Sequence, residues 1–271
     1  MEDYLIGVFD SGFGGLEVLR EITKKLPEYS YIYLGDTARA PYGSRSQETI
    51  YAFTKQAVDF LFRNDCWLII LACNTASSGA LHRIQREYLP RYYPQRRILG
   101  VIIPACEEAA ERTKNNRVGI IATEATVSSG AFGREIKKLN PKIKVFQQAC
   151  PLLVPMIEEG WQKSQEINSV LNYYLRPLRQ AKVKILVLGC THYPLLLNQI
   201  KKIMGPHCFV PNPGSIVAKS LRDYLSRHDE IKRQLTKNSK TKYFVTDLNE
   251  NFEKVARRFL GTKIQIKLAK Y

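Results

Sequence analysis

The sequence has 271 residues, of which 45% are hydrophobic, so it holds enough apolar material for an ordered core. This length fits one large domain or two domains of about 100–150 residues each. No segment reaches the run of about 20 apolar residues that a membrane-spanning helix needs, so we expect no membrane association. The first residues lack the basic region and long apolar run of a secretory signal, which predicts a cytoplasmic protein.

The formal net charge is +16 at pH 7, and residues 201–271 contain 16 Lys/Arg against six Asp/Glu. A basic surface of this size can bind nucleic acid. The charges are scattered, however, and the sequence has no basic motif interleaved with aromatic residues. We therefore interpret the charge as a solvated surface and do not expect nucleic acid as a partner.

Short apolar segments rich in β-branched residues alternate with longer amphipathic segments along the chain. The predicted strands are Ile6–Phe9, Tyr31–Leu34, Leu68–Leu71, Ile98–Val101, Arg117–Ile121, Lys144–Gln147, Ile185–Leu188, Cys208–Val210 and Tyr243–Val245. The predicted helices are Gly15–Lys25, Ser46–Asn64, Ser77–Tyr88, Pro104–Lys114, Ser129–Leu139, Leu152–Glu159, Ser164–Ala181, Leu195–Met204 and Ser215–His228. This alternation predicts an α/β fold with mainly parallel sheets, in which ligands bind at the carboxyl ends of the strands.

Two pairs of segments resemble one another within the chain. IGVFDS at residues 6–11 resembles VGIIAT at 118–123, and LIILACNT at 68–75 resembles ILVLGCTH at 185–192. Two similar α/β units that face each other would form a cleft lined by both sets of strand ends. We therefore predict two pseudo-twofold related domains, residues 1–97 plus 207–271 and residues 98–206, with the active site between them.

The six cysteines show neither C-x-x-C pairs nor the histidine spacing of zinc sites, so we predict no disulfide framework and no metal site. Cys73 and Cys190 share a distinctive setting. Each follows a fully apolar predicted strand, comes directly after a small residue and precedes polar residues that open a helix. Such a helix start suits a carboxylate ligand. The remaining cysteines lack this setting and are interpreted as structural: Cys66, Cys106, Cys150 and Cys208.

Two further loops are rich in ligand-binding residue types. The segment 10–15, DSGFGG, follows the first predicted strand, and its glycines allow a ligand to approach the backbone closely. It lacks the lysine of a P-loop and the G-x-G-x-x-G spacing. The segment 35–44 places Asp36, Arg39 and Tyr42 in one loop, so it offers both charge signs to a zwitterion. A turn with an internal Asp–Arg ion pair is the alternative interpretation.

Four segments together resemble the motifs of glutamate racemases, in the aspartate/glutamate racemase superfamily. They are VFDSGFGGL at 8–16, GDTARAPYGSRS at 35–46, LACNTAS at 71–77 and LGCTHYPLL at 188–196. The resemblance covers nearly the whole chain in the same order. It implies a pseudo-twofold α/β fold and the interconversion of L- and D-glutamate, which supplies D-glutamate for peptidoglycan. It also implies that neither pyridoxal phosphate nor a metal is used.

The resemblance implies roles for individual residues. Cys73 and Cys190 match two thiols that remove and deliver the α-proton of the substrate. Asp10 matches a polar group that assists Cys73, whereas Glu158 and His192 match groups that assist Cys190. The substrate-binding positions implied in the same way are Asp10, Ser11, Tyr42, Gly43, Asn74, Thr75, Thr123, Thr126, Thr191 and His192.

Three positions depart from the pattern of the family. Ala122 stands where glycine is expected, Phe132 stands where tyrosine is frequent, and the turn at 212–214, NPG, often carries aspartate. None of these positions has a proposed catalytic role. The departures therefore concern loop geometry and regulation rather than the activity.

Three other functions are compatible with parts of the sequence. The chain could be another enzyme of the superfamily that acts on aspartate, hydantoins or maleate. A cysteine hydrolase would use a Cys–His pair, but His192 lies only two residues after Cys190 and Cys73 would be redundant. A nucleic-acid-binding or topoisomerase-binding protein would leave both cysteine motifs unexplained.

A homodimer is compatible with the sequence, which does not decide the oligomeric state.

Overall fold

The computed structural model describes residues 4–248 and 265–271, and the strands among them are all paired in parallel. The strands are β1 (Leu5–Asp10), β2 (Tyr31–Gly35), β3 (Cys66–Leu71), β4 (Arg97–Gly100), β5 (Arg117–Ala122), β6 (Lys144–Ala149), β7 (Ile185–Gly189), β8 (Thr241–Val245) and β9 (Ile266–Leu268). They form a first sheet in the order β4-β3-β1-β2-β8-β9 and a second sheet in the order β6-β5-β7. The predicted α/β fold with mainly parallel sheets is confirmed.

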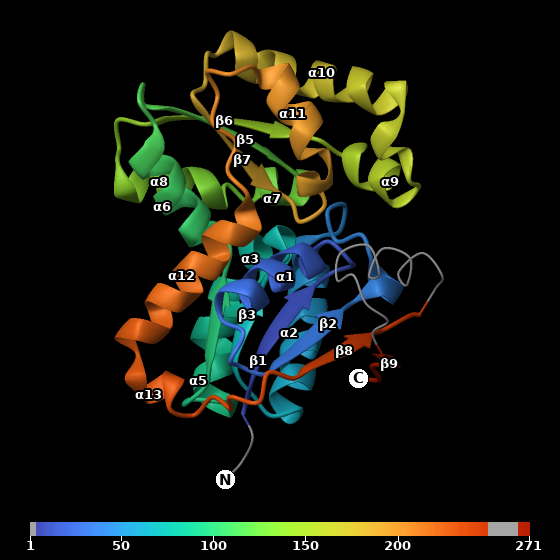
Figure 1. The fold of residues 1–271 in the computed structure, drawn as a ribbon, viewed down its shortest axis with the longest axis vertical. Helices are drawn as coiled ribbons and strands as arrows, with labels where there is room; N and C mark the ends of the chain where they lie inside the picture. Colours follow the sequence, from blue (N-terminus) through green and yellow to red (C-terminus); the bar gives the residue numbers. More distant parts are fainter. Residues whose placement is uncertain (1–3, 249–264) are drawn as a thin grey trace.

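Helices lie around both sheets, and the two sheets belong to two lobes of the molecule (Figure 1). The longer helices are α1 (Gly15–Lys25), α2 (Gln47–Arg63), α6 (Ile102–Arg112), α8 (Ala131–Leu139), α10 (Gln165–Gln180), α11 (Leu197–Met204) and α12 (Pro213–Arg227). The short helical segments are η1 (Thr37–Arg39), α3 (Asn74–Gly79), α4 (Leu81–Arg83), η2 (Ile84–Tyr88), α5 (Leu89–Tyr92), α7 (Glu124–Ser128), α9 (Leu153–Glu158), η3 (Trp161–Lys163), η4 (Tyr193–Leu196) and α13 (Asp229–Lys232). None of the described helices is long and apolar enough to cross a membrane.

The central strands are buried along their whole length, because helices cover both faces of the sheets. Every residue of β1, β2 and β7 is buried. Strands of parallel sheets that are covered in this way consist of continuous apolar runs rather than of alternating residues. This burial explains why the predicted strands were recognisable as short apolar segments.

The internal similarity in the sequence corresponds to equivalent strand pairs in the two sheets. In the first sheet β1 lies beside β3, with Phe9 paired to Leu71. In the second sheet β5 lies beside β7, with Ala122 paired to Gly189. The carboxyl ends of the two similar segments therefore meet at one edge of each sheet, and both cysteine motifs begin there.

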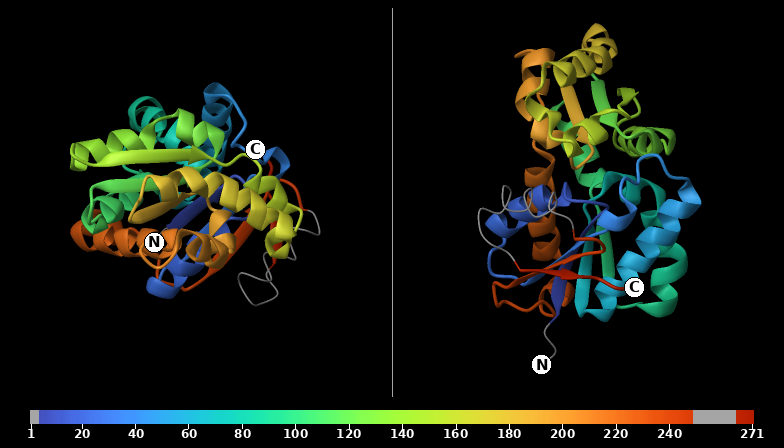
Figure 2. Two further views of the ribbon diagram at one scale, coloured as in Figure 1. Left: turned by 90° about the horizontal axis from the view of Figure 1, so that it is seen from above. Right: turned by 90° about the vertical axis from the view of Figure 1, so that its right-hand side faces the viewer.

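The last part of the chain returns to the first sheet. Strands β8 and β9 extend that sheet beyond β2, and α12 lies beside α1 (Figures 1 and 2). The predicted division at residue 97 would cut β4, which pairs with β3 in the first sheet. The two-domain division therefore stays a prediction, and the sheets place residues 98–100 with the first lobe.

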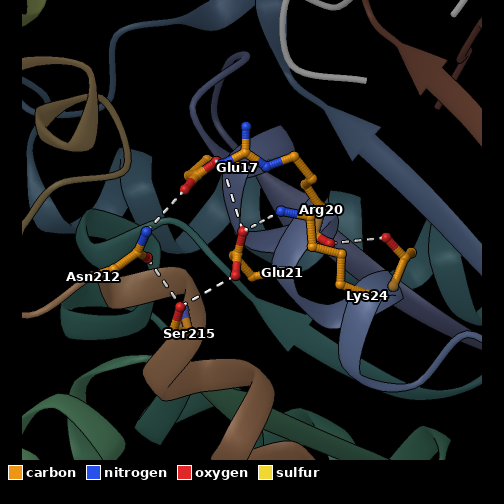
Figure 3. A network of polar contacts seen from close by, with 7 residues as sticks. Glu17, Arg20, Glu21, Lys24, Asn212 and Ser215 are labelled. Atoms are coloured by element: carbon orange, nitrogen blue, oxygen red, sulfur yellow. Dashed lines mark hydrogen bonds and ion pairs between the residues drawn. The ribbon is translucent and has the colours of Figure 1, made fainter. Parts of the chain in front are cut away.

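Polar contacts join the start of α12 to α1 (Figure 3). The Asn212 amide donates a hydrogen bond to Glu17 Oε1 over 3.2 Å, and the Ser215 hydroxyl donates to Glu21 Oε2 over 3.2 Å. The Asn212 side chain also caps α12, because its Oδ1 accepts from the backbone N–H of Ser215. A Cβ at Gly214 would lie 3.0 Å from Glu21, so a small residue is needed where the two helices meet.

The structure differs from the predicted secondary structure at three places. Residues 208–210 form only an isolated bridge between Phe209 and Ile185 instead of a strand. Pro211 follows directly and has no backbone N–H to extend the ladder. Strand β9 was not predicted, because its residues alternate apolar and basic side chains on a short exposed edge. The helix predicted to begin at Ser77 begins at Asn74.

Gly189 marks a close approach between β7 and β5. A Cβ built there would lie 2.9 Å from the Cβ of Ala122, 3.1 Å from the carbonyl oxygen of Ile121 and 3.2 Å from the ring of Phe132. Two of the residues that depart from the family pattern, Ala122 and Phe132, thus fill the space beside Gly189. Because a backbone oxygen is among the neighbours, a larger residue forces the end of β7 to move.

We predict that Gly189→Ala lowers the free energy of unfolding by about 1–3 kcal/mol, because overpacking strains the core. The matched control is Gly133→Ala in α8, where a Cβ would meet nothing nearer than 3.8 Å. The control variant should be unchanged or up to about 1 kcal/mol more stable, since alanine favours helix over glycine. Urea unfolding measures both, and equal stability of the two variants would contradict the close packing at Gly189.

Candidate active site

A carboxylate at the end of β1 is buried at the boundary between the two lobes. Asp10 is fully buried, and its Oδ2 accepts a hydrogen bond from the Gly12 N–H over 3.0 Å. Its Oδ1 accepts from the hydroxyl of Thr191, in the other lobe, over 3.1 Å. Burial raises the pKa of Asp10, although these hydrogen bonds and the charge of His192 oppose the rise. A Cβ at Gly15 would lie 2.5 Å from the Asp10 Cβ, so only glycine lets α1 begin here.

Cys73 lies at the N-terminal end of α3, directly after β3. Its Sγ accepts a hydrogen bond from the Ala76 N–H over 3.5 Å and lies 3.4 Å from the Ser11 hydroxyl. Burial raises the pKa of the Cys73 thiol to about 12, and the negative charge of Asp10 adds to the rise. The contacts with Ser11 and Ala76 act in the opposite direction. The group is therefore a thiol at neutral pH that can hold a proton for transfer.

Cys190 lies at the end of β7, beside an imidazole and a carboxylate. The Cys190 Sγ is 3.8 Å from His192 Nδ1, and His192 Nε2 is 3.1 Å from Glu158 Oε1. The edge of the imidazole also packs on Phe13, with ring centroids 4.6 Å apart. Burial lowers the pKa of His192, but its hydrogen bonds to Cys190 and Glu158 outweigh burial and raise the pKa to about 10. His192 is therefore protonated at neutral pH.

Three threonine hydroxyls connect the two lobes on the other side of the cavity. Thr75 Oγ1 lies 2.9 Å from Thr123 Oγ1 and 3.3 Å from Thr126 Oγ1, and the latter two are 3.0 Å apart. Thr123 also caps α7, since its hydroxyl accepts from the Thr126 N–H. Thr75 belongs to the first cysteine motif, whereas Thr123 follows β5. The hydroxyl cluster thus offers both donors and acceptors to a polar ligand.

The loop that carries Tyr42 and Gly43 closes the cavity from the first lobe. The Tyr42 hydroxyl donates to the Asp36 carboxylate, so it is already engaged away from the cavity. Gly43 lies so close to Thr123 that a Cβ would come within 2.8 Å of it, and its carbonyl accepts from the Ala125 N–H. We therefore expect Tyr42 and Gly43 to meet a ligand through backbone groups and the tyrosine ring.

These side chains enclose one small cavity, with a volume of about 20 Å³, between the carboxyl ends of the strands. Asp10 and Thr126 lie directly behind its wall, in contact with lining residues. The predicted site residues that line it are Ser11, Tyr42, Gly43, Cys73, Asn74, Thr75, Thr123, Glu158, Cys190, Thr191 and His192. Both cysteines thus face a common space, one from each lobe.

Three lining residues were missed by the sequence analysis. Ala40 and Pro41 precede Tyr42 in the same loop, and Val154 lies one helical turn before Glu158 on α9. The i, i+4 spacing between Val154 and Glu158 could have indicated that both side chains share a face of the helix. Apolar residues carry no chemical signal of their own, so only this spacing was available.

The other cysteines do not take part in this site. Burial raises the pKa of each of their thiols, as it does for Cys73, but none of them lines the cavity. Within residues 4–248 and 265–271, no three His, Cys, Asp or Glu side chains are grouped so that they could hold a metal ion. The predicted absence of a metal or other cofactor stays a prediction.

A larger groove, of about 1180 Å³, lies at the opposite edge of the second sheet. Its lining includes Asn115, which precedes β5, and Lys184, which precedes β7, so it lies at the amino ends of these strands. Five of its lining residues are lysine or arginine: Arg112, Lys114, Lys184, Lys201 and Lys202. Neither Cys73 nor Cys190 reaches the groove, so the small cavity is the better candidate for chemistry.

Comparison with known proteins identifies the family of the chain. Residues 6–213 match the Asp/Glu/Hydantoin racemase family. The chain belongs to this family. It is therefore an isomerase of the racemase type, and this match spans both cysteine motifs and the loops around them.

Several relatives of this racemase are glutamate racemases. The one from Geobacter metallireducens is 42% identical over 260 residues, which cover 96% of this chain and 93% of the relative. The crystal structure of glutamate racemase isoform RacE1 from Bacillus anthracis has a TM-score of 0.91 and 33% identity, over 100% of this chain and 98% of that one. The Francisella tularensis glutamate racemase, solved in complex with D-glutamate, has a TM-score of 0.88 and 34% identity over the same shares.

The raised pKa of His192 predicts a pH-dependent stability of this racemase. Because the folded protein binds the imidazole proton more tightly than the unfolded chain does, the added stability is fully present below about pH 6.5. It is lost as the pH rises through about 10. The difference in unfolding free energy between wild type and His192→Gln should therefore decrease over this range.

Urea unfolding followed by circular dichroism, from about pH 5.5 to about pH 10, measures the difference. His82→Gln removes an exposed histidine away from the cavity and controls for the loss of an imidazole. A difference that grows as the pH rises would show that His192 is not held in its protonated form.

Proposed function

We propose that this racemase interconverts L- and D-glutamate by a two-base mechanism in which Cys73 and Cys190 address opposite faces of the substrate α-carbon. The observation that carries the proposal is the position of the two thiols: they follow equivalent strands of the two lobes and line one cavity. Glutamate as the substrate is supported by the identity to glutamate racemases over nearly the whole chain. The biological role that follows is the supply of D-glutamate for peptidoglycan.

Two fixed bases suit racemisation because a proton leaves one face of the α-carbon and another arrives at the opposite face. A single base would have to move across the substrate. In the direction from L- to D-glutamate, Cys190 removes the α-proton as a thiolate and Cys73 delivers its thiol proton to the other face. In the reverse direction the two groups exchange roles, so no proton is gained or lost overall.

Neighbouring side chains assist proton transfer at the two thiols. His192 is protonated and lies 3.8 Å from Cys190, so it is placed to donate a proton to the Cys190 thiolate, and Glu158 holds the imidazole from its other nitrogen. On the opposite side the Ser11 hydroxyl contacts Cys73, and the carboxylate of Asp10 acts on the thiol through its charge. Donors from Asn74, Thr75 and Thr191 and their helix starts are suited to the substrate carboxylates.

The cavity is too small for glutamate as it stands. Its volume of about 20 Å³ is little more than one water molecule needs. The cavity must therefore widen for the substrate to enter and close around it for the reaction. In the closed form few water molecules can reach the carbanion-like transition state, which favours proton exchange with the thiols.

Neither a cofactor nor a partner is part of this proposal. Proton transfer by the two thiols needs no pyridoxal phosphate or metal. A homodimer remains a prediction, and the cavity is lined by residues of a single chain. The binding of nucleic acid to the basic groove is likewise not expected.

The first test is chiral analysis of L-glutamate after incubation with purified protein that has been dialysed against a chelator. We expect equal amounts of L- and D-glutamate at equilibrium, and little turnover of aspartate or a hydantoin in parallel samples. Activity that returns only when pyridoxal phosphate or a divalent metal is added would exclude the proposed mechanism. A preference for aspartate would favour the alternative substrate of the superfamily.

The second test separates the roles of the two thiols. Cys73→Ser and Cys190→Ser should each lose most racemisation, because a serine hydroxyl is a much weaker acid than a thiol. Elimination of a leaving group from the β-carbon of a glutamate analogue needs only the first deprotonation. Cys73→Ser should therefore still process the L-analogue and Cys190→Ser the D-analogue, with opposite preferences.

Turnover of the separate L- and D-analogues by each variant measures these preferences. Cys106→Ser, at a buried cysteine outside the cavity, is the matched control and should keep the wild-type activity. If either active-site variant processed both enantiomers equally, one base would serve both faces and the two-thiol mechanism would be wrong.

A further inference from the structure

The ring of Tyr271 covers an arginine behind the active-site loop. The Arg39 guanidinium carbon lies 4.8 Å from the centroid of the Tyr271 ring and 4.1 Å from that of Phe53. Tyr271 also packs edge-on against Phe60, with centroids 5.7 Å apart. The guanidinium is therefore held by two aromatic faces, one of which comes from the part of the chain after β9.

Arg39 in turn holds a carboxylate that has no contact with solvent. Its Nε donates to both oxygens of Asp36, over 3.0 and 2.8 Å, and its Nη1 donates to Gln56. Asp36 is fully buried and also accepts hydrogen bonds from the hydroxyls of Tyr42 and Thr246. A buried carboxylate needs such partners, so displacement of Arg39 would disturb every group bound to Asp36.

The residues between Arg39 and Gly43 form one wall of the cavity. Ala40, Pro41, Tyr42 and Gly43 all line it. One end of this wall is fixed by the Arg39–Asp36 ion pair and by the Tyr42–Asp36 hydrogen bond. The other end, at Gly43, packs against the second lobe. The segment is therefore held at both ends and free to shift only if one end is released.

We propose that Tyr271 is a positioning residue for substrate binding: it holds Arg39 on Asp36 and thereby fixes the cavity wall formed by residues 40–43. The inference rests on the proposed glutamate racemase function for its substrate. The contacts run in sequence from the Tyr271 ring to Arg39, to Asp36 and to Tyr42 in the wall. Tyr271 itself does not line the cavity and takes no part in proton transfer.

Backbone contacts with the first sheet hold Tyr271 in place beside Arg39. The Ala269 N–H donates to the carbonyl of Val245 over 2.7 Å, and Ala269 is buried. Thr246, the next residue after Val245, donates to Asp36. The final strands thus reach the Asp36 cluster at two points, through Thr246 and through the Tyr271 ring.

The experiment compares Tyr271→Ala, Tyr271→Phe and wild type. Loss of a partly exposed cation–π contact corresponds to a factor of about three to ten in an equilibrium constant. We expect Tyr271→Ala to raise the KM for both glutamate enantiomers by about this factor while kcat changes less than twofold. Tyr271→Phe keeps the ring on Arg39 and should keep the wild-type KM.

Tyr92→Ala is the matched control. Tyr92 is an exposed tyrosine of the same lobe, and the Arg91 guanidinium lies 5.5 Å from its ring centroid, but it does not reach the Asp36 cluster. This variant should leave both KM and kcat unchanged. A second readout does not depend on the substrate: amide hydrogen exchange of residues 36–44 should be faster in Tyr271→Ala than in Tyr92→Ala.

Three outcomes would overturn the inference. An unchanged KM and unchanged exchange in Tyr271→Ala would show that the ring does not fix the wall. If Tyr271→Phe raised the KM as much as Tyr271→Ala does, the contact between the ring and Arg39 would not be the cause of the higher KM. An equal loss of activity and of melting temperature in both alanine variants would indicate a general loss of stability. A failure of the wild-type protein to racemise glutamate would instead contradict the proposed function, and the exchange measurement would still test the positioning.

Discussion

The hydrogen bond between Thr191 and Asp10 is the contact on which the arrangement of the site depends. It joins the strand ends of the two lobes and helps to satisfy a carboxylate that burial would otherwise make costly. The contact requires Gly14, since a Cβ there would lie 2.5 Å from Thr191 Oγ1. Cys73 follows β3, which lies beside β1, and Cys190 directly precedes Thr191. This approach of the two backbones therefore brings both thiols to one cavity.

The two sides of the cavity are chemically different although their backbones are similar. Cys190 lies beside an imidazole that is itself held by a carboxylate, whereas Cys73 lies beside a hydroxyl and a buried acid. Burial raises the pKa of Cys73 and of Asp10. Burial lowers the pKa of His192, but the hydrogen bonds of the imidazole outweigh this effect and raise the pKa. In the proposed mechanism the forward and reverse reactions therefore use different neighbours to move their protons, although both directions use the same two thiols.

Local patterns in the sequence predicted the features that depend on neighbouring residues along the chain. Apolar runs indicated the buried strands, and the small and polar residues around Cys73 and Cys190 indicated where the chain leaves the sheets. Contacts between distant segments were not accessible in this way. The bond between Thr246 and Asp36 joins residues 210 positions apart, and neither residue type is unusual in its own segment. Strand β9 and the lining residue Val154 likewise depend on what packs beside them rather than on their own composition.

The return of the chain to the first sheet has a consequence for the order in which the molecule can assemble during synthesis. The second sheet is built from one continuous segment, β5 to β7, and so can complete itself as soon as that segment has left the ribosome. The first sheet contains the earliest strand, β1, but also β8 and β9, and α1 packs beside α12. The first lobe therefore keeps one sheet edge and one helix face uncovered until α12, β8 and β9 have been synthesised.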